Sequence, residues 1–388
     1  MPTLSWITES LRDLEEEDLL RELPLGLEVA KPRAGGLVNF ASNDYLGLAS
    51  DPRVVEAASA ACRDQGVGRA ASPLICGRST LHEQLERELA RFLNAEAALL
   101  FTSGYAANVG IIPALVDRGD CLYGDALNHA SLIDGCRLAR AERKVYRHGD
   151  IEQLEAMLQE GRNFRRRLIV SDTLFSMDGD LAPLPQLVRL AQKHDAMLLI
   201  DEAHALGVFG ANGCGAWEHF RHEIPDDDSL PVVRIGTLSK AFGSAGGFVA
   251  GSQNLIHWLA NRARSYVFST AHPAANAAAA LKSLEIVHSD RTAGTKLLSR
   301  AAELRASLVG QGWDVAPSAS QIIPLRVGSA ERAILLGKRL REAGYWVPAI
   351  RPPSVPEGQS LLRLSLTAAH TEEMISGLLA ALGTKEPD

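Results

Sequence analysis

The sequence predicts an α/β fold, in which helices cover both faces of a mostly parallel β-sheet and a smaller α+β unit follows. Two observations predict this class. From about residue 97 to about residue 250, short apolar runs alternate with amphipathic segments of helical period, as in buried parallel strands joined by helices. From about residue 285 the pattern changes to helix, strand, helix, strand and helix. The 388-residue chain is long enough for two or three domains, which we expect at residues 1–45, 46–284 and 285–388.

The individual elements follow in order along the chain. An acidic amphipathic helix is expected over about residues 8–22, a second helix over 82–94, and the first buried strand over 97–101. Further strands are expected at 121–123, 145–146, 168–170, 197–200, 232–237 and 247–250, with helices at 131–139, 151–158 and 184–194. In the C-terminal part we expect strands near 322–327 and 362–366, a helix at 333–343 and a closing helix from residue 371. The segment 350–356 is too rich in proline for a helix or a central strand.

Composition excludes several classes of function. The net charge of -7 provides no basic face for a nucleic-acid backbone, so nucleic acid is not expected as a partner. No apolar stretch is long enough to span a bilayer, and the acidic N-terminal region is not a signal or transit peptide. The five cysteines show no Cys-x2-Cys spacing, which disfavours a disulfide framework and a zinc site and suits the reducing cytoplasm.

Two apolar runs end in polar, reactive residues. Asp201 and His204 follow the run at 197–200, and Lys240 follows the run at 232–237 among hydroxyls and glycines. Because open α/β sheets bind ligands at the carboxyl ends of their strands, we expect these side chains to meet there. A lysine in such a place can form a Schiff base with an aldehyde cofactor, while a carboxylate and an imidazole tune the attached ring.

Each of these residues also has a structural interpretation. A Ser-Lys pair is most often a solvated turn, Asp201 alone could be a helix cap, and His204 alone could be a buried core histidine. Asp-Glu-Ala-His also occurs in nucleotide-driven helicases, but the Gly-x4-Gly-Lys-Ser/Thr loop that they need is absent. A metal hydrolase built on Asp201 and His204 is disfavoured because no third ligand lies at a plausible spacing. A Rossmann dehydrogenase is disfavoured because no Gly-x-Gly-x-x-Gly fingerprint follows an early strand.

Two further segments are suited to binding anions. Ser103 and Gly104 follow the strand at 97–101 in a strand-to-helix turn, where backbone amides can hold an anion. Arg363 lies inside the apolar strand at 362–366. An arginine in a strand is either a solvated edge residue or a bidentate clamp for a carboxylate.

Together these residues resemble the α-oxoamine synthases, pyridoxal-phosphate (PLP) enzymes of aminotransferase-like fold (fold type I) that condense an amino acid with an acyl-CoA. The resemblance covers almost the whole chain. Its motifs, in order, are Ser42-Asn43-Asp44-Tyr45-Leu46-Gly47, Ser103-Gly104-Tyr105-Ala106-Ala107-Asn108, Asn128-His129-Ala130-Ser131, Phe175-Ser176-Met177-Asp178-Gly179-Asp180, Asp201-Glu202-Ala203-His204, Thr237-Leu238-Ser239-Lys240 and Leu362-Arg363-Leu364. The resemblance implies a large PLP-binding domain with a seven-stranded sheet, a small C-terminal domain, pyridoxal 5'-phosphate as cofactor and a homodimer with shared active sites.

The resemblance assigns the groups around the cofactor ring. It makes Lys240 the Schiff-base lysine and the base that removes the α-proton, and Asp201 the partner of the pyridine nitrogen, which keeps the ring an electron sink. It places His129 stacked on the ring, and His204 and Ser176 near the phenolic oxygen. The alternative for His129 is a helix cap in an Asn-His pair.

The resemblance also assigns contacts to the cofactor phosphate. Gly104 and Tyr105 match the turn whose amides hold the phosphate, and Thr237 and Ser239 add hydroxyls. Thr270 matches a residue that reaches the phosphate of the other subunit. Its alternative is a cap for the alanine-rich helix that follows.

Substrate contacts are implied as well. Arg363, assisted by Asn43, matches the clamp for the amino-acid carboxylate, which selects the bond that stands perpendicular to the ring. Arg21 and Ser354 match positions near the acyl substrate, although a lone arginine on an acidic helix is usually a surface ion pair.

The segment 347–356 is similar to members that join L-alanine to pimeloyl-CoA, or to pimeloyl-acyl-carrier protein, in biotin biosynthesis. Two positions depart from the family pattern: Ser354 stands where threonine is usual, and residues 68–73 replace a loop rich in glycine and serine. Sibling reactions remain alternatives, namely glycine with acetyl-CoA or serine with a long-chain acyl-CoA. A non-catalytic subunit of the same fold is another alternative, against which Lys240 argues.

Overall fold

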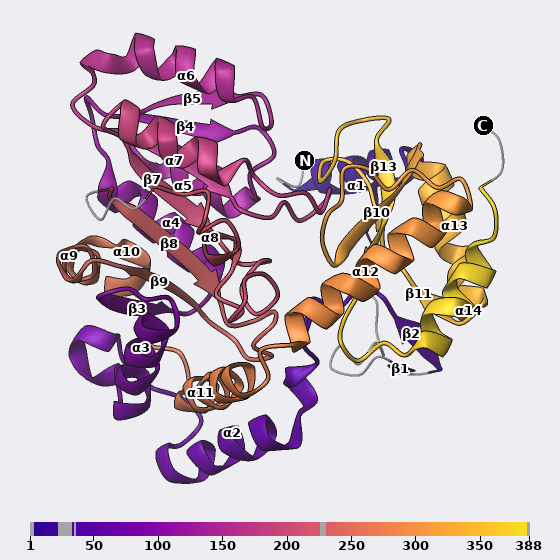
Figure 1. Cartoon of the computed structure of the whole chain (residues 1–388), viewed down its shortest axis with the longest axis horizontal. Coiled ribbons are helices and arrows are strands. Elements are labelled where there is room, and N and C mark those ends of the chain that lie inside the picture. Colours follow the sequence, from indigo (N-terminus) through magenta and orange to yellow (C-terminus); the bar gives the residue numbers. More distant parts are fainter. Residues whose placement is uncertain (1–3, 22–32, 35, 226–229, 386–388) are drawn as a thin grey trace. The chain divides into compact units, whose positions relative to one another are not determined.

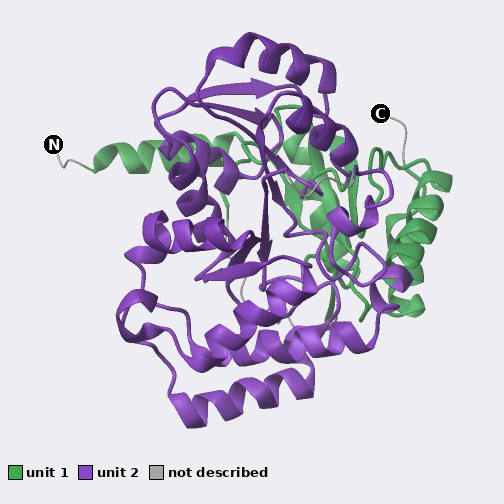
Figure 2. Cartoon of the chain, turned by 60° about the vertical axis from the view of Figure 1, so that its left-hand side comes forward, with its two compact units in different colours: residues 1–42, 177–179, 297–388 green, residues 43–176, 180–296 purple. Residues whose placement is uncertain are grey.

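The computed structural model of the chain describes residues 4–21, 33–34, 36–225 and 230–385. Contacts divide the chain into two compact units, shown in Figure 2. Unit 1 comprises Met1–Ser42, Met177–Gly179 and Leu297–Asp388, and unit 2 comprises Asn43–Ser176 and Asp180–Lys296. The N-terminal segment belongs with the C-terminal one because its strand β2 (Leu37–Asn39) pairs with β11 (Tyr345–Trp346). The domain boundaries expected after residues 45 and 284 stay a prediction.

Unit 2 is built on the seven-stranded sheet (Figure 1). The strands, in chain order, are β3 (Ala97–Phe101), β4 (Cys121–Asp125), β5 (Glu142–Tyr146), β6 (Arg167–Asp172), β7 (Met197–Asp201), β8 (Val232–Thr237) and β9 (Gly247–Gly251). Their spatial order is β3-β9-β8-β7-β6-β4-β5. Only β9 runs antiparallel to its neighbours, and the other adjacent pairs of this sheet are parallel.

The inner strands are buried on both faces, which is why they are short and mostly apolar, whereas the edge strand β5 carries Glu142, Arg143 and Lys144 and is largely exposed. In β3, Leu99 and Phe101 join the core cluster that includes residues of α4 and α9, whereas Ala98 and Leu100 join the cluster that includes residues of α3 and α11. Successive strand residues point to opposite faces, so one strand contributes to two cores. Figure 1 shows helices on both sides of the sheet.

The helices of unit 2 are α2 (Pro52–Gln65), α3 (Thr80–Phe92), α4 (Gly104–Leu115), α5 (Ala130–Leu138), α6 (Ile151–Glu160), α7 (Leu184–Lys193), α8 (Ala216–His219), α9 (Gln253–Arg262), α10 (Arg264–Val267) and α11 (Ala274–Ser289). The helices predicted at 82–94, 131–139, 151–158 and 184–194 correspond to α3, α5, α6 and α7. The sequence prediction named no helix for α2 or α9.

Unit 1 contains two small three-stranded sheets. In one, β2 lies between β1 (Arg33–Ala34) and β11; in the other, β13 (Ser360–Ser365) lies between β10 (Ile322–Gly328) and β12 (Ala349–Ile350). Helix α13 (Ala330–Glu342) packs on the second sheet, and the closing helix is α14 (Glu372–Leu382). Helix α12 (Ala293–Gly310) contains the boundary between the units.

The N-terminal helix differs from its prediction. Helix α1 spans Ser5–Glu16 rather than residues 8–22, and none of its residues is buried. The chain turns where Asp18 adopts a positive φ of 56° and the amides of Leu19 and Leu20 both bond to the carbonyl of Leu14. Arg21 therefore does not lie on the helix.

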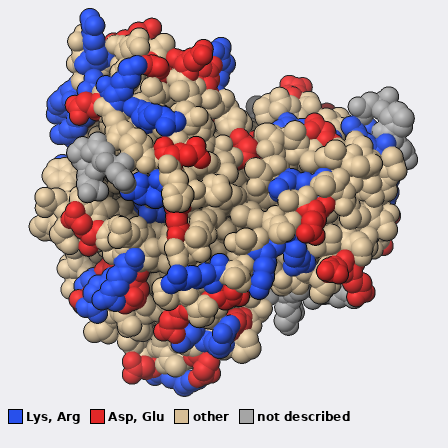
Figure 3. Space-filling model, viewed as in Figure 1, with Lys and Arg blue, Asp and Glu red and all other residues tan. Residues whose placement is uncertain are grey.

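On the face shown in Figure 3, lysines and arginines are interspersed with aspartates and glutamates. Among the described residues, no helix is both long and apolar enough to cross a membrane.

Candidate active site

Four parallel strands of unit 2 end in a polar residue at the same edge of the sheet. These residues are Asp125 of β4, Asp172 of β6, Asp201 of β7 and Thr237 of β8. Asp172 and Asp201 are direct register partners on adjacent strands. Ligands bind to an open α/β sheet at the carboxyl ends of its parallel strands. These four residues lie at that edge.

Asp201 is held by two hydrogen bonds. Its Oδ2 accepts from Nδ2 of Asn108 at 2.7 Å, and its Oδ1 accepts from the amide of Ala203 at 2.9 Å. The second bond closes a turn after β7; the next helix along the chain is α8, which begins at Ala216, so the helix-cap interpretation of Asp201 is wrong. Asn108 is buried in α4, and its Oδ1 has no hydrogen-bond partner among the described residues.

His129 is the N-cap of α5, so the helix-cap interpretation describes its local structure correctly. Its Nδ1 accepts from the amide of Ser131 at 3.2 Å and lies 2.7 Å from Oγ of Ser131. The same Oγ accepts from Nδ2 of Asn108 at 2.9 Å. A continuous chain of side chains therefore runs from His129 through Ser131 and Asn108 to Asp201.

Four ionisable groups lie close together, namely His129, Asp172, Asp201 and Lys240. Burial lowers the pKa of His129, the Asp201 carboxylate opposes this shift and the Lys240 ammonium adds to it. Burial raises the pKa of Asp172 well above its usual range, and the charge of Asp201 raises it further. Oδ2 of Asp172 also accepts from the amide of His129 at 2.6 Å. The structure thus places Lys240, His129 and Asp201 near one another.

His204 is buried and is bonded to a residue for which the sequence suggested no role. Its Nδ1 lies 2.6 Å from the hydroxyl of Tyr45, which is itself completely buried and donates to Oδ1 of Asn43 at 3.2 Å. Asn43, Tyr45 and His204 therefore form one chain of contacts within unit 2. Tyr45 lies in the Ser42-to-Gly47 motif, which was the available signal.

The residues predicted to hold a phosphate also converge. Ser103 caps α4 by accepting from the amide of Ala106 at 3.0 Å, so the first amides of a 12-residue helix open at this edge. A Cβ built on Gly104 would lie 3.4 Å from Cβ of Thr237. Oγ1 of Thr237 lies 2.8 Å from Oγ of Ser239. A helix N-terminus beside two hydroxyls is suited to a dianion.

The backbone of Gly247 approaches the backbone of this turn closely, which explains why a glycine is found there. A Cβ on Gly247 would lie 2.5 Å from the backbone nitrogen of Gly104, so no other residue fits there without a shift of the turn. The side chain of Tyr105 is 48% exposed and donates to Oδ2 of Asp134 at 2.5 Å. Only the backbone amide of Tyr105 is therefore placed at the helix start.

Ser176 is half-buried in the turn that follows β6, between Phe175 and Asp180. The amide of Phe175 donates to the carbonyl of Asp180 at 3.0 Å and closes this turn.

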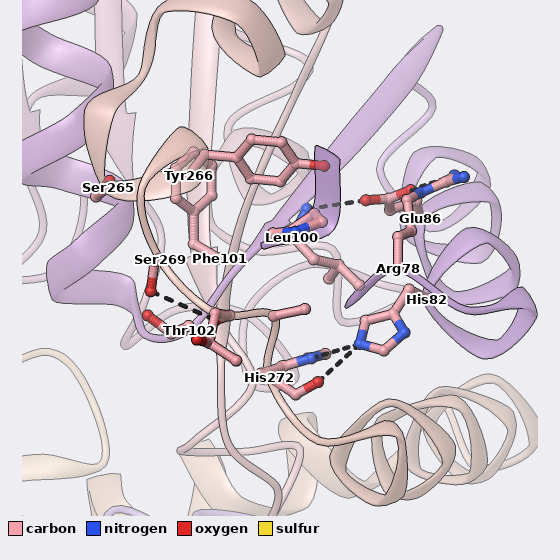
Figure 4. A pocket seen from close by; sticks show the side chains of 13 residues that line it. Arg78, His82, Glu86, Leu100, Phe101, Thr102, Ser265, Tyr266, Ser269 and His272 are labelled. Atoms are coloured by element: carbon pink, nitrogen blue, oxygen red, sulfur yellow. Dashed lines mark hydrogen bonds and ion pairs between the residues drawn. The ribbon is translucent and has the colours of Figure 1, made fainter. Parts of the chain in front are cut away.

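Thr270 is exposed on the segment between α10 and α11, beside a cavity of about 20 Å³ that is too small for a cofactor (Figure 4). His82 and His272 also line this cavity, where Nε2 of His82 lies 2.9 Å from Nδ1 of His272 and 2.9 Å from the His272 carbonyl. Pro273 is the N-cap of α11 and no side chain caps this helix, so the cap interpretation of Thr270 is wrong.

Three predicted substrate residues lie in unit 1. Arg363 is 5% exposed on β13, the central strand of its sheet, so the interpretation as a solvated edge residue is wrong. Its Nη1 donates to Oγ of Ser365 at 3.1 Å. Nη2 of Arg21 donates to Oγ of Ser354 at 3.2 Å at the surface, which brings together the two residues expected near the acyl substrate.

A cavity of about 620 Å³ in unit 1 is lined by Arg21. Its other lining residues are Glu15, Asp18, Leu20, Ile334, Gly337, Lys338, Arg341, Trp346, Val347, Pro348, Ala349 and Arg351. The walls therefore combine apolar groups with four cationic side chains. The guanidinium of Arg351 bonds to the carbonyls of Asp18 and Leu20, which fastens the segment after α1 to this cavity.

All five cysteines are free thiols. Within the part of the chain that the structure describes, no group of three or more histidine, cysteine or acidic side chains could hold a metal ion.

Known proteins resemble this chain over almost its whole length. The family model of aminotransferase class I and II matches residues 36–382. An 8-amino-7-oxononanoate synthase of Anaeromyxobacter dehalogenans (strain 2CP-1) is 47% identical over 99% of this chain and 96% of its own length. The 8-amino-7-oxononanoate synthase of Herminiimonas arsenicoxydans is 43% identical over 97% of this chain and 98% of its own length.

Two solved structures confirm the predicted fold type I architecture. A serine palmitoyltransferase from S. paucimobilis with a bound PLP-myriocin aldimine has a TM-score of 0.89, 29% identity, and coverage of 98% of this chain and 96% of its own. An 8-amino-7-oxononanoate synthase from Francisella tularensis has a TM-score of 0.75, 27% identity, and coverage of 89% and 96%. The chain therefore belongs to the aminotransferase class I and II family and, within it, to the α-oxoamine synthases.

Proposed function

We propose that this protein condenses L-alanine with a pimeloyl thioester to give 8-amino-7-oxononanoate, releasing CO2 and the carrier thiol, in biotin biosynthesis. Relatives named 8-amino-7-oxononanoate synthase, which are 43–47% identical over nearly the full chain, support this class of reaction. The observation that carries the proposal is the meeting of Lys240, His129 and Asp201 at the ligand-binding edge of the sheet.

The groups at this edge of the sheet are chemically suited to hold pyridoxal 5'-phosphate. The start of α4 with Thr237 and Ser239 suits its phosphate, Asp201 suits its pyridine nitrogen, and the half-buried Lys240 offers an amine for its aldehyde. When bound, the cofactor supplies an electron sink for a carbanion at the α-carbon of the amino acid.

The remaining ring contacts have simple physical roles. The Asp201 carboxylate would favour the protonated form of the pyridine nitrogen, and the bond from Asn108 holds this carboxylate in place. His129, uncharged because burial lowers its pKa, would stack on the ring. His204, oriented by Tyr45, and Ser176 would bond to the phenolic oxygen. The Lys240 amine would move the α-proton of the amino acid.

Arg363 would bind the carboxylate of L-alanine, assisted by Asn43. A buried guanidinium on a central strand is a rigid bidentate donor, which makes it suited to fixing the bond that breaks.

The cavity of unit 1 would receive the acyl chain. Its apolar residues Ile334, Val347 and Pro348 suit methylene groups, and Lys338 and Arg341 suit a distal carboxylate such as that of a pimeloyl chain. Glu15 and Asp18 also line the cavity, so its four cationic side chains face two carboxylates, and a terminal carboxylate of the acyl chain would supply a third anion. We therefore expect a dicarboxylic acyl group.

We propose that the protein is a cytoplasmic homodimer in which Thr270 reaches the cofactor phosphate of the partner subunit. The exposed position of Thr270 on the segment between α10 and α11 supports a contact outside its own chain.

A second candidate is the condensation of L-serine with a long-chain acyl-CoA. It is favoured by the TM-score of 0.89 to a serine palmitoyltransferase. The cationic side chains of the unit 1 cavity argue against a long apolar chain.

The test is a panel of substrates with the PLP-loaded protein, in which release of the carrier thiol is measured. Amino acids are L-alanine, glycine and L-serine; acyl donors are pimeloyl-CoA, pimeloyl-acyl-carrier protein, octanoyl-CoA, acetyl-CoA and palmitoyl-CoA. We expect L-alanine with a pimeloyl donor to have the highest kcat/KM, at least about tenfold above glycine, because one methyl group in a fitted pocket contributes about 1–3 kcal/mol. Lys240→Ala should release no thiol. No release with any amino acid would end the proposal, and preference for L-serine with palmitoyl-CoA would establish the second candidate.

A further inference from the structure

His148 lies between two aspartates that come from different parts of unit 2. Its Nδ1 is 3.0 Å from Oδ1 of Asp125, at the end of β4, and its Nε2 is 2.8 Å from Oδ2 of Asp180, in the turn after β6. Burial disfavours the charged imidazole, but the hydrogen bonds and charges of these two carboxylates outweigh it and raise the pKa of His148 to about 10. The side chain is therefore a cation at neutral pH and bridges two anions.

Asp125, one of the two aspartates that His148 bridges, also accepts hydrogen bonds from the backbone near His129. Oδ1 of Asp125 also accepts from the amide of Leu127 at 2.8 Å, and its Oδ2 accepts from the amide of Gly149 at 3.0 Å. His129, the N-cap of α5, follows two residues after Leu127. The carboxylate of Asp125 thus fixes the backbone from which His129 projects.

Asp180, the other aspartate, belongs to the turn that contains Ser176. The backbone carbonyl of Asp180 closes the turn by accepting from the amide of Phe175, and Leu174 forms a β-bridge with Leu181. The ring of His148 also packs against Phe175, with centroids 4.4 Å apart and planes at 82°. His148 therefore contacts both ends of the turn that contains Ser176.

We propose that His148 is a positioning residue that fixes His129 and Ser176 relative to each other, and so sets the geometry of two groups at the cofactor ring. The proposal rests on the proposed function, because His129 and Ser176 matter together only if both contact the cofactor. His148 itself touches neither of them in its described bonds, and acts through Asp125, Asp180 and Phe175.

A neutral side chain at this position would leave the buried carboxylate of Asp125 facing the partly buried carboxylate of Asp180, with no cation between them to hold the two loops together. A side chain that keeps the charge and two donors would restore it. His148→Gln tests the first case, and His148→Arg tests the second. The matched control is His194→Gln, since His194 also lies beside a carboxylate, with Nε2 3.7 Å from Glu155, but contacts neither loop.

The experiment measures PLP affinity of the cofactor-free proteins by equilibrium dialysis, and the pH midpoint of the absorbance change of the bound cofactor. For His148→Gln we expect about tenfold weaker binding, which equals about 1.4 kcal/mol, and a displaced midpoint. His148→Arg should recover to within about threefold of wild type, and His194→Gln should match wild type. Circular dichroism and unfolding curves show whether each variant is folded. If His148→Gln fails to fold, the double variant His148→Gln/Asp180→Asn, which removes the facing charges, should fold and still show the displaced midpoint.

Three results would overturn the proposal. His148→Gln could lose only unfolding free energy while keeping wild-type affinity and spectrum, which would make His148 purely structural. His148→Arg could behave no better than His148→Gln. The folded double variant could show the wild-type midpoint. If the wild-type protein itself took up no PLP, the proposed function would fail first, so the two failures are distinguishable.

Discussion

At the scale of single residues, Asp201 carries the strongest expectation. Asp201→Asn keeps the acceptor for the amide of Ala203 but removes the negative charge that would hold a pyridine nitrogen protonated. We expect kcat to fall by at least about 100-fold, the range seen when one fixed electrostatic contact of an active site is removed. Thiol release under saturating L-alanine measures it.

The matched control is Asp51→Asn. Asp51 caps α2 by accepting from the amide of Arg53 at 2.8 Å, so this variant changes a capping aspartate in the same unit. It should leave kcat unchanged. If Asp201→Asn were as active as Asp51→Asn, Asp201 would have only a structural role in the turn after β7.

The sequence predicted Lys240, Asp201 and His204 because reactive side chains at the ends of two apolar runs carry their own signal. It did not predict Asn108, Ser131 or Tyr45 as parts of the site. Their importance arises from contacts across long sequence distances, such as the bond between Asn108 and Asp201. Such contacts have no local pattern.

At the scale of elements, the start of α4 can be tested by removing its cap. Ser103→Ala removes the acceptor for the amide of Ala106 and should cost about 1 kcal/mol of unfolding free energy. Because the same turn would hold the phosphate, PLP should also bind more weakly. Denaturant unfolding and equilibrium dialysis provide the two measurements.

Ser252 caps α9 in the same way, accepting from the amide of Leu255 at 3.3 Å. Ser252→Ala should therefore lower stability by a similar amount without affecting PLP binding. Equal PLP affinities for both variants would show that the α4 turn does not hold the cofactor.

Strands and helices were predictable from the sequence where both faces of a strand, or one continuous stripe of a helix, are buried. The strands of the large sheet were expected within a few residues because they are short apolar runs. Helix α1 was placed too far along the chain, because Leu19 and Leu20 continue the apolar pattern after the helix has ended at Glu16. The environment of Arg363 was not predictable, since the strand order that buries β13 comes from pairing with distant segments.

At the scale of the whole molecule, buried histidines make folding sensitive to acid. His370 accepts from the amide of Thr367 at Nδ1, and its Nε2 lies 3.0 Å from the carbonyl of Asn39, so it is held as a neutral ring. Burial lowers its pKa to about 4. Between about pH 6.5 and pH 4 the unfolded chain binds one more proton than the folded chain at this site, so stability falls as pH falls, by about 1.4 kcal/mol per pH unit.

His370→Asn should flatten this part of the pH profile of unfolding free energy. His257, exposed on α9, is the control, and His257→Asn should keep the wild-type slope. A slope unchanged in His370→Asn would show that His370 titrates normally in the folded protein.

The shared active site can be tested by mixing inactive chains. If Thr270 acts on the partner's cofactor, a heterodimer of Lys240→Ala with Thr270→Ala has one site with both native residues. After random subunit exchange half of the dimers are mixed, so about a quarter of wild-type activity should appear. No gain over the separate variants would place Thr270 in its own chain's site or outside any site.

The fold class was predictable because the alternation of elements and the motif order extend over most of the chain. The grouping of the N-terminal segment with the C-terminal unit was not, since it depends on the pairing of β2 with β11 across about 300 residues.

The most direct test of the central claim is the stoichiometry of the reaction with carboxyl-labelled L-alanine and a pimeloyl thioester. The PLP-loaded protein should release labelled CO2, carrier thiol and 8-amino-7-oxononanoate in a ratio of one to one to one, and Lys240→Ala should release none of them. Thiol release without labelled CO2, or a product that retains the label, would contradict a decarboxylative condensation at Lys240.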